Sequence, residues 1–199
     1  KFETPDNPRY VIGSIGPGTK LLTLGQTTWE TMFASYREQV RGLLAGGVDV
    51  LLIETQQDML AVKCCIAAAN DAMSEAGKGR RRVPIMVQAS FDTNNGQQML
   101  TGSDPSALVA TFTPYDEVQC LGLNCALGPF ELAESARYIA ENWPRFVSAG
   151  LSARRVRRTV LLNRFLRRTG RCRAGAEPEI SCCRRRCRCR FRCERFRFR

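Results

Sequence analysis

The chain contains no histidine among its 199 residues. Imidazole is the most common general acid and base in enzymes, so acid–base catalysis through histidine is excluded, along with every catalytic triad built on it. Metal sites with imidazole ligands are excluded as well. The chemistry that remains available is that of thiolates and carboxylates.

Long apolar runs are also missing. No stretch approaches the roughly 18 consecutive apolar residues of a membrane-spanning helix. Hydrophobic residues make up 44% of the chain and charged residues 25%, which is typical of soluble globular proteins. We expect a cytoplasmic protein without a membrane partner. Because the first residue is Lys1, we also expect the natural start to lie upstream.

Lysine is absent after residue 150, and the charge changes sign there. Residues 1–150 carry 12 basic and 16 acidic side chains, whereas residues 151–199 carry 18 arginines and 3 acidic side chains. We therefore expect two regions, a folded body over 1–150 and a disordered arginine- and cysteine-rich tail over 151–199. The tail's composition can neither fill a strand of a barrel nor bury a core.

Two interpretations of the tail remain open. It could bind nucleic acid non-specifically through its arginines, with Phe191, Phe196 and Phe198 stacking on bases. It could instead be an out-of-frame translation product, since lysine is absent and the change of composition falls within an expected strand. We favour the second interpretation.

The cysteines divide in the same way. The body holds Cys64, Cys65, Cys120 and Cys125, and the other six of the ten lie in the tail. Adjacent cysteines on a helix point about 100° apart, so Cys64 and Cys65 are expected to pack in the core. Cys120 is expected to point into the core from a strand. The body uses cysteine as cytosolic proteins do.

Strand and helix patterns alternate along the body. Strands are predicted over 10–15, 48–53, 83–91 and 118–124, with a fifth beginning at 145–148. Helices are predicted to begin near Thr28, Asp58 and Asp104, residue types that cap helices, and a fourth covers 130–142. The residues at the strand ends, Gly16, Glu54, Phe91 and Cys125, are 38, 37 and 34 positions apart.

This spacing is compatible with two architectures. An eight-unit barrel averages roughly 31 residues per unit, and a doubly wound open sheet fits nearly as well. In either case the carboxyl ends of the strands would carry the chemistry. The segment 13–18 reads GxxGxG with Pro17 inside it, which favours a tight turn over a dinucleotide-binding loop.

Glu54 and Cys125 are the candidate functional residues at the strand ends. A carboxylate after an apolar strand must be solvated, paired or functional, because an unpaired buried charge is costly. The thiol of Cys125 could be a packing residue, a nucleophile or a metal ligand. Residue type and position alone do not choose among these roles.

Five motifs occur in series along the body. They are Ile-Gly-Ser-Ile-Gly-Pro over 12–17, Tyr-Arg-Glu-Gln-Val-Arg-Gly-Leu-Leu over 36–44, Gly-Val-Asp-Val-Leu-Leu-Ile-Glu-Thr over 47–55 with Asp58, Leu-Thr-Gly-Ser-Asp-Pro over 100–105, and Gly-Leu-Asn-Cys-Ala-Leu-Gly-Pro over 122–129. Together they resemble the homocysteine-binding domain of the cobalamin-dependent methionine synthases, a branch of the homocysteine S-methyltransferases. The resemblance runs from about residue 9 to residue 148.

The resemblance implies an α/β fold, a TIM barrel of which about four and a half of eight βα units are present here, truncated at both ends. It also implies that Cys125 is the first of three cysteine ligands of Zn²⁺ and that Glu54 holds the amino group of homocysteine. Asn124 and Gly16 would help shape the same substrate-binding mouth.

Zinc would bind the substrate sulfur as a thiolate, the nucleophile needed for methyl transfer. In the family that sulfur takes its methyl group from methylcobalamin on a separate domain, and methionine is formed. The implied partners are homocysteine and the cobalamin- and folate-binding domains of a longer enzyme. A homocysteine methyltransferase that uses another methyl donor is the alternative.

The chain departs from the family after residue 148. In the family, a Gly-Gly-Cys-Cys-Gly segment at the eighth strand supplies the last two zinc ligands, and no such segment is present. Cys182 and Cys183 are adjacent, but they lack the flanking glycines and a preceding apolar strand. We therefore expect this chain by itself to bind zinc weakly and to be inactive.

Overall fold

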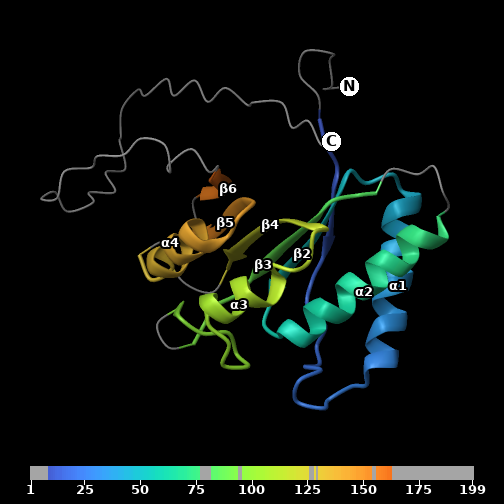
Figure 1. The fold of residues 1–199 in the computed structure, drawn as a ribbon, viewed down its shortest axis with the longest axis horizontal. Coiled ribbons are helices and arrows are strands. Elements are labelled where there is room, and N and C mark those ends of the chain that lie inside the picture. The colour runs from blue at the N-terminus through green and yellow to red at the C-terminus, as the bar shows by residue number, and fades with distance from the viewer. Residues whose placement is uncertain are drawn as a thin grey trace, which may run out of the picture. The chain divides into compact units, whose positions relative to one another are not determined.

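The computed structural model describes residues 9–76, 82–93, 96–125, 128, 130–153 and 156–162. All of them lie in one compact unit that ends at Arg167. Its elements, in chain order, are β1 (Ile12–Ile15), α1 (Trp29–Ala45), β2 (Val50–Gln56), α2 (Met59–Glu75), β3 (Ile85–Ala89), α3 (Pro105–Phe112), β4 (Val118–Asn124), α4 (Ala133–Asn142), β5 (Phe146–Ala153) and β6 (Val156–Leu162). Figure 1 shows their arrangement.

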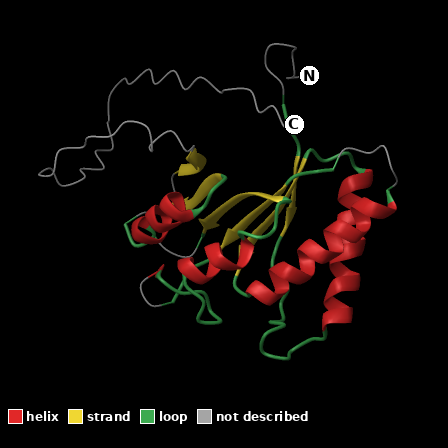
Figure 2. Ribbon diagram, in the orientation of Figure 1, coloured by secondary structure: helices red, strands yellow, loops and turns green. Residues whose placement is uncertain are grey.

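The strands form one sheet in the order β1-β2-β3-β4-β5-β6. The first five strands run parallel to one another, and a helix follows each of the first four (Figure 2). A doubly wound sheet would reverse its strand order at a switch point, whereas a barrel adds each new strand beside the last. The sequential order therefore identifies the fold as a partial (β/α) barrel and confirms the expected four units and a fifth strand.

One face of the sheet packs against the helices. Alternate strand residues point to this face and are fully buried, as the pleat requires, including Leu51, Ile53, Ile85, Val87 and Leu121. On α2 the buried positions are mainly small residues. Small side chains let this helix approach β2 and α1 closely. The buried cysteines Cys64 and Cys65 belong to this layer, as expected.

Side-chain caps start three of the helices. Thr28 accepts a hydrogen bond from the Thr31 N–H at the start of α1, and Asp58 and Asp104 accept corresponding bonds in α2 and α3. These are the capping residues that the sequence predicts. No side chain caps α4, which begins at Ala133, three residues later than expected.

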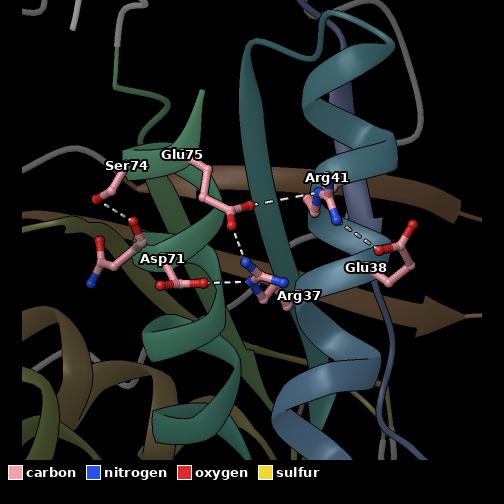
Figure 3. A network of polar contacts seen from close by, with 7 residues as sticks. Arg37, Glu38, Arg41, Asp71, Ser74 and Glu75 are labelled. Atoms are coloured by element: carbon pink, nitrogen blue, oxygen red, sulfur yellow. Dashed lines mark hydrogen bonds and ion pairs between the residues drawn. The ribbon is translucent and has the colours of Figure 1, made fainter. Parts of the chain in front are cut away.

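The helix pair α1 and α2 is also joined on its solvent side. Arg37 of α1 forms ion pairs with Asp71 and Glu75 of α2, and Arg41 lies within 3.7 Å of Glu75 and 3.4 Å of Glu38 (Figure 3). These side chains are about one third to three quarters exposed. Exposed ion pairs contribute little individually, so packing of the apolar face holds the pair together.

Two strands continue further than expected. Strand β2 continues to Gln56, which pairs with Ala89 after a register shift, so Glu54 lies near the end of the strand instead of directly after it. Strand β5 continues to Ala153, and β6 pairs with it in antiparallel direction. The sheet thus extends past residue 150. Residues 163–199 are outside the described part, and disorder there stays a prediction.

Candidate functional site at the strand ends

The carboxyl ends of the parallel strands gather the polar residues that the sequence points to. Glu54 lies near the end of β2, and Cys125 directly follows β4. The Cys125 N–H donates to the Gly150 carbonyl of β5 over 3.1 Å. In barrel enzymes this edge of the sheet carries the active site.

Asn124 connects these strand ends. Its Nδ2 donates to Glu54 Oε2 over 3.2 Å and to Thr55 Oγ1 over 3.0 Å, and its Oδ1 accepts from the Thr55 N–H over 3.0 Å. Strand β3 lies between β2 and β4 in the sheet, so the carboxamide reaches across the end of a strand. Asn124 is 5% exposed.

Thr55 completes a chain of polar contacts to the thiol. Its Oγ1 lies 3.8 Å from Cys125 Sγ. Because Oγ1 accepts a hydrogen bond from Asn124 Nδ2, its own proton is available to the sulfur. Glu54, Thr55, Asn124 and Cys125 are therefore one connected group.

Both Thr55 and Cys125 have left-handed backbones, with φ of 59° and 61°. Among the described residues they are the two non-glycine positions with positive φ. A β-branched residue in this region is a true outlier, and such strain is concentrated at functional sites. That both strained residues lie in one hydrogen-bonded group is an observation independent of residue type.

The other carboxylate oxygen of Glu54 is held from β1. Ser14 Oγ hydrogen-bonds to Glu54 Oε1, so the carboxylate is fixed on both sides by neutral groups. No basic side chain forms an ion pair with Glu54 among the described residues. We call Ser14, Glu54, Thr55, Asn124 and Cys125 the strand-end cluster.

Gly16 follows β1 at the same edge of the sheet. A side chain added there would meet no atom within 4 Å. The turn therefore leaves open space beside the cluster, and the predicted contact of Gly16 with substrate stays a prediction.

Below the cluster, the same face of the sheet is closely packed. Gln88 Nε2 donates to Ser148 Oγ over 2.9 Å, and both side chains are buried. A Cβ on Gly122 would lie 1.9 Å from the Ser148 carbonyl oxygen. Glycine is thus required where β4 and β5 approach each other, directly beneath Asn124.

The three other thiols in the described part of the chain are buried. Burial raises the pKa of Cys64 and of Cys120 to about 11, and it raises the pKa of Cys65 still further. Thiolate chemistry is disfavoured at all three. Cys125 is partly exposed and differs from them, as the sequence predicts.

A zinc ion would need more ligands than these residues provide. Within the described ranges, no three histidine, cysteine, aspartate or glutamate side chains come together to hold a metal ion. Protein zinc sites use three or four such ligands. Cys125 supplies one thiolate, so the described residues do not fit a zinc site by themselves. Cys182 and Cys183 lie outside the described residues.

Sequence reasoning missed the roles of Ser14 and Thr55. Ser14 is a polar residue within an apolar strand, and alternation places it on the same face as Ile12, away from the buried Ile15. That pattern could have indicated a residue of the site. Nothing local marks Thr55, because its partners are 69 and 70 positions away.

None of the described helices is both long enough and apolar enough to cross a membrane.

Known proteins provide a comparison for this geometry. The family model described as Homocysteine S-methyltransferase matches residues 1–164. The chain is 42% identical over 142 residues to methionine synthase of Mycobacterium leprae and 40% identical over 139 residues to methionine synthase of Mycobacterium tuberculosis. The matched regions cover 71% and 70% of this chain but 11% of each relative.

Solved structures agree on the fold. The chain resembles the homocysteine methyltransferase MmuM from Escherichia coli in its apo form with a TM-score of 0.56 and in its metallated form with a TM-score of 0.59, each at 19% identity. The similarity covers 72% and 75% of this chain and 49% and 51% of those chains. Because the family model covers most of the chain and the fold agrees, the chain belongs to the homocysteine S-methyltransferase family.

Proposed function

We propose that this chain is the homocysteine-binding part of a methyltransferase that moves a methyl group to the homocysteine sulfur and so forms methionine. The observation that carries the proposal is the strand-end cluster, where a carboxylate and a partly exposed thiol are joined by hydrogen bonds at the active edge of a barrel. Family membership supplies the substrate class.

Glu54 is proposed to bind the substrate's ammonium group. Its carboxylate is partly buried, has no ion-pair partner in the described part of the chain, and is oriented by Ser14 and Asn124. A charge-assisted hydrogen bond to an ammonium would satisfy it. The role of Glu54 is therefore to fix the amino-acid end of homocysteine.

Cys125 is proposed to be one thiolate ligand of the family's zinc. The other two ligands would have to come from residues beyond those described, so the proposal for this part of the chain covers substrate binding and orientation. Zinc binding by the isolated chain should accordingly be weak, and the chain should be inactive alone.

The methyl donor is proposed to be methylcobalamin on a separate domain. Support comes from the two methionine synthases, which share 42% and 40% identity with this chain, whereas the similarity to MmuM is 19%. The chain matches 11% of each methionine synthase, which leaves room for cobalamin- and folate-binding domains in a longer protein. A homocysteine methyltransferase with another donor remains the second candidate.

Titration with L-homocysteine, followed by amide NMR shifts of the full chain, tests the substrate assignment. We expect saturable shifts at residues 54, 55 and 125, and a loss of affinity of about ten-fold or more in Glu54→Gln, the cost of a charge-assisted bond. Glu134→Gln is the matched control, because Glu134 lies on α4 and contacts Gln97 instead of the cluster. Equal affinity in Glu54→Gln and wild type would refute the role of Glu54.

Zinc content tests the metal assignment separately. We expect less than one equivalent of zinc in the purified chain by elemental analysis. Stoichiometric, tightly held zinc that is lost in both Cys125→Ser and Cys182→Ser would overturn this expectation. It would show that the tail completes the site.

A further inference from the structure

We infer that Asn124 is a positioning residue that sets the separation of Glu54 and Cys125, and that it does not itself contact the substrate. The inference rests on the proposed function for the identity of the ligand, an amino thiol. It assigns to Asn124 a different role from the substrate contact that the family resemblance implies.

Both hydrogen-bond donors of the Asn124 side chain are already used. Both Nδ2 protons have acceptors, Glu54 Oε2 and Thr55 Oγ1, and Oδ1 accepts from the Thr55 N–H. A side chain that is 5% exposed and has both N–H groups engaged has no free donor for a ligand and offers little surface to one. The role left to this side chain is to fix the positions of Glu54 and Thr55.

The backbone around Asn124 is fixed as well. The following residue, Cys125, donates its N–H to the Gly150 carbonyl over 3.1 Å. A Cβ on Gly150 would lie 3.0 Å from the Asn124 Cβ, so glycine there leaves just enough room for the side chain. Asn124 is thus seated between β4 and β5 while its carboxamide reaches β2.

Three consecutive contacts connect the Glu54 carboxylate to the Cys125 thiol and set the distance between them. From Glu54 Oε2 the path runs 3.2 Å to Asn124 Nδ2, 3.0 Å on to Thr55 Oγ1, and 3.8 Å on to Cys125 Sγ. Thr55 keeps its strained backbone because Asn124 bonds both its N–H and its hydroxyl. Without the carboxamide, relief of that strain would let the strand ends move apart.

Disulfide exchange at Cys125 tests the positioning role of Asn124 without requiring zinc. The Cys125 thiolate attacks a symmetrical disulfide, forms a mixed disulfide and releases one thiolate of the reagent. The reagents are L-homocystine and 4,4′-dithiodibutyrate, which has the same chain length but no amino group. Mass spectrometry of the Cys125 peptide gives the occupancy with each reagent, and the occupancy ratio is the amine preference.

In wild type we expect an amine preference of about ten-fold, because only the homocysteine adduct can bond Glu54. Glu54→Gln should abolish the preference. Asn124→Ala should reduce it to less than about three-fold. Gln119→Ala is the matched control and should keep the wild-type preference, because Gln119 is an amide on the same strand whose Nε2 donates to the Asp116 carbonyl instead of to the cluster.

Thr55→Val and Thr55→Ser test the same contacts in case the Asn124→Ala protein does not fold. Valine removes the hydroxyl that links Asn124 to the thiol, and serine retains it. We expect a reduced preference in Thr55→Val and recovery in Thr55→Ser, a difference that a general loss of stability would not produce.

The outcomes separate the inference from the proposed function. A wild-type preference that survives Asn124→Ala and Thr55→Val overturns the positioning role and leaves the role of Glu54 intact. No preference in wild type, with Cys125 fully reactive, overturns the role of Glu54 and the inference with it. A preference lost in Asn124→Ala and Thr55→Val but kept in Gln119→Ala and Thr55→Ser supports both.

Discussion

The strand-end cluster and the helix pair α1 and α2 are built in opposite ways. The helix pair combines regular backbones, side-chain caps and an apolar interface with exposed ion pairs on its outer side (Figure 3). The cluster combines two left-handed non-glycine backbones with polar contacts between residues about 70 positions apart. Among the described residues, the helix pair thus has regular, capped backbones, whereas both left-handed non-glycine backbones lie at the carboxyl edge of the sheet, where we propose that the substrate binds.

A pair of glycine substitutions, one in each region, should give the largest difference in unfolding free energy. Gly122→Ala places a Cβ 1.9 Å from the Ser148 carbonyl oxygen and should cost about 3 kcal/mol or more. Gly42→Ala lies within α1, where a Cβ meets nothing within 4 Å, and should stabilise by up to about 1 kcal/mol. Urea unfolding measures both. A neutral Gly122→Ala would contradict the close packing of β4 against β5.

Thiol reactivity gives the second contrast. Raising the pKa of Cys64 and Cys120 from 9.0 to about 11 lowers their thiolate population about a hundred-fold at pH 8. Iodoacetamide should therefore modify Cys125 first among the four body cysteines, as measured by peptide mapping of the native chain. Equal labelling of Cys64 or Cys120 would contradict their burial.

The same shifts predict a pH dependence of stability. Because the folded state keeps these thiols protonated, their contribution is complete below pH 9 and is lost as the pH rises toward 11. Cys64→Ala with Cys120→Ala should flatten the stability curve in that window. An unchanged curve would show that other groups control it.

The stability lost on replacing a capping residue should depend on how many other groups that residue binds. Asp58 is 2% exposed and accepts hydrogen bonds from Leu60, Ala61 and both the N–H and the hydroxyl of Thr23, so Asp58→Ala should cost about 2 kcal/mol. Thr28→Ala, at an exposed cap, should cost about 1 kcal/mol. Equal losses in urea unfolding would show that the contacts to Thr23 add nothing.

The smallest effect is expected at the ion pairs of α1 and α2. Arg37→Gln removes the contacts to Asp71 and Glu75 and should cost about 0.5 kcal/mol at low salt. The loss should shrink at high salt, where exposed charges are screened. A salt-independent loss would indicate that the arginine stem, not its charge, stabilises the pair.

The helices and strands outside the cluster were largely predictable because their signals are local. Thr28, Asp58 and Asp104 cap helices within a few residues of themselves, and the run at 118–124 coincides with β4. Glu54 and Cys125 were found because strand ends can be located from the same local pattern. Their connection through Asn124 and Thr55 depends on strand order and register, which no short window of sequence contains.

The barrel was expected from the family resemblance, not from periodicity. Periodicity alone allowed a doubly wound sheet, and the order of neighbouring strands confirmed the barrel. The continuation of β2 to Gln56 depends on pairing with Ala89, so it was invisible in the sequence of β2 alone. The antiparallel pairing of β6 with β5 likewise has no counterpart among the predicted strands.

A crystal structure of the chain grown with L-homocysteine would test the central claim most directly. The claim predicts the amino nitrogen within hydrogen-bond distance of the Glu54 carboxylate and the sulfur beside Cys125, with the Asn124 contacts to Glu54 and Thr55 unchanged. Homocysteine bound away from the strand ends, or bound there with its amino group turned away from Glu54, would contradict it.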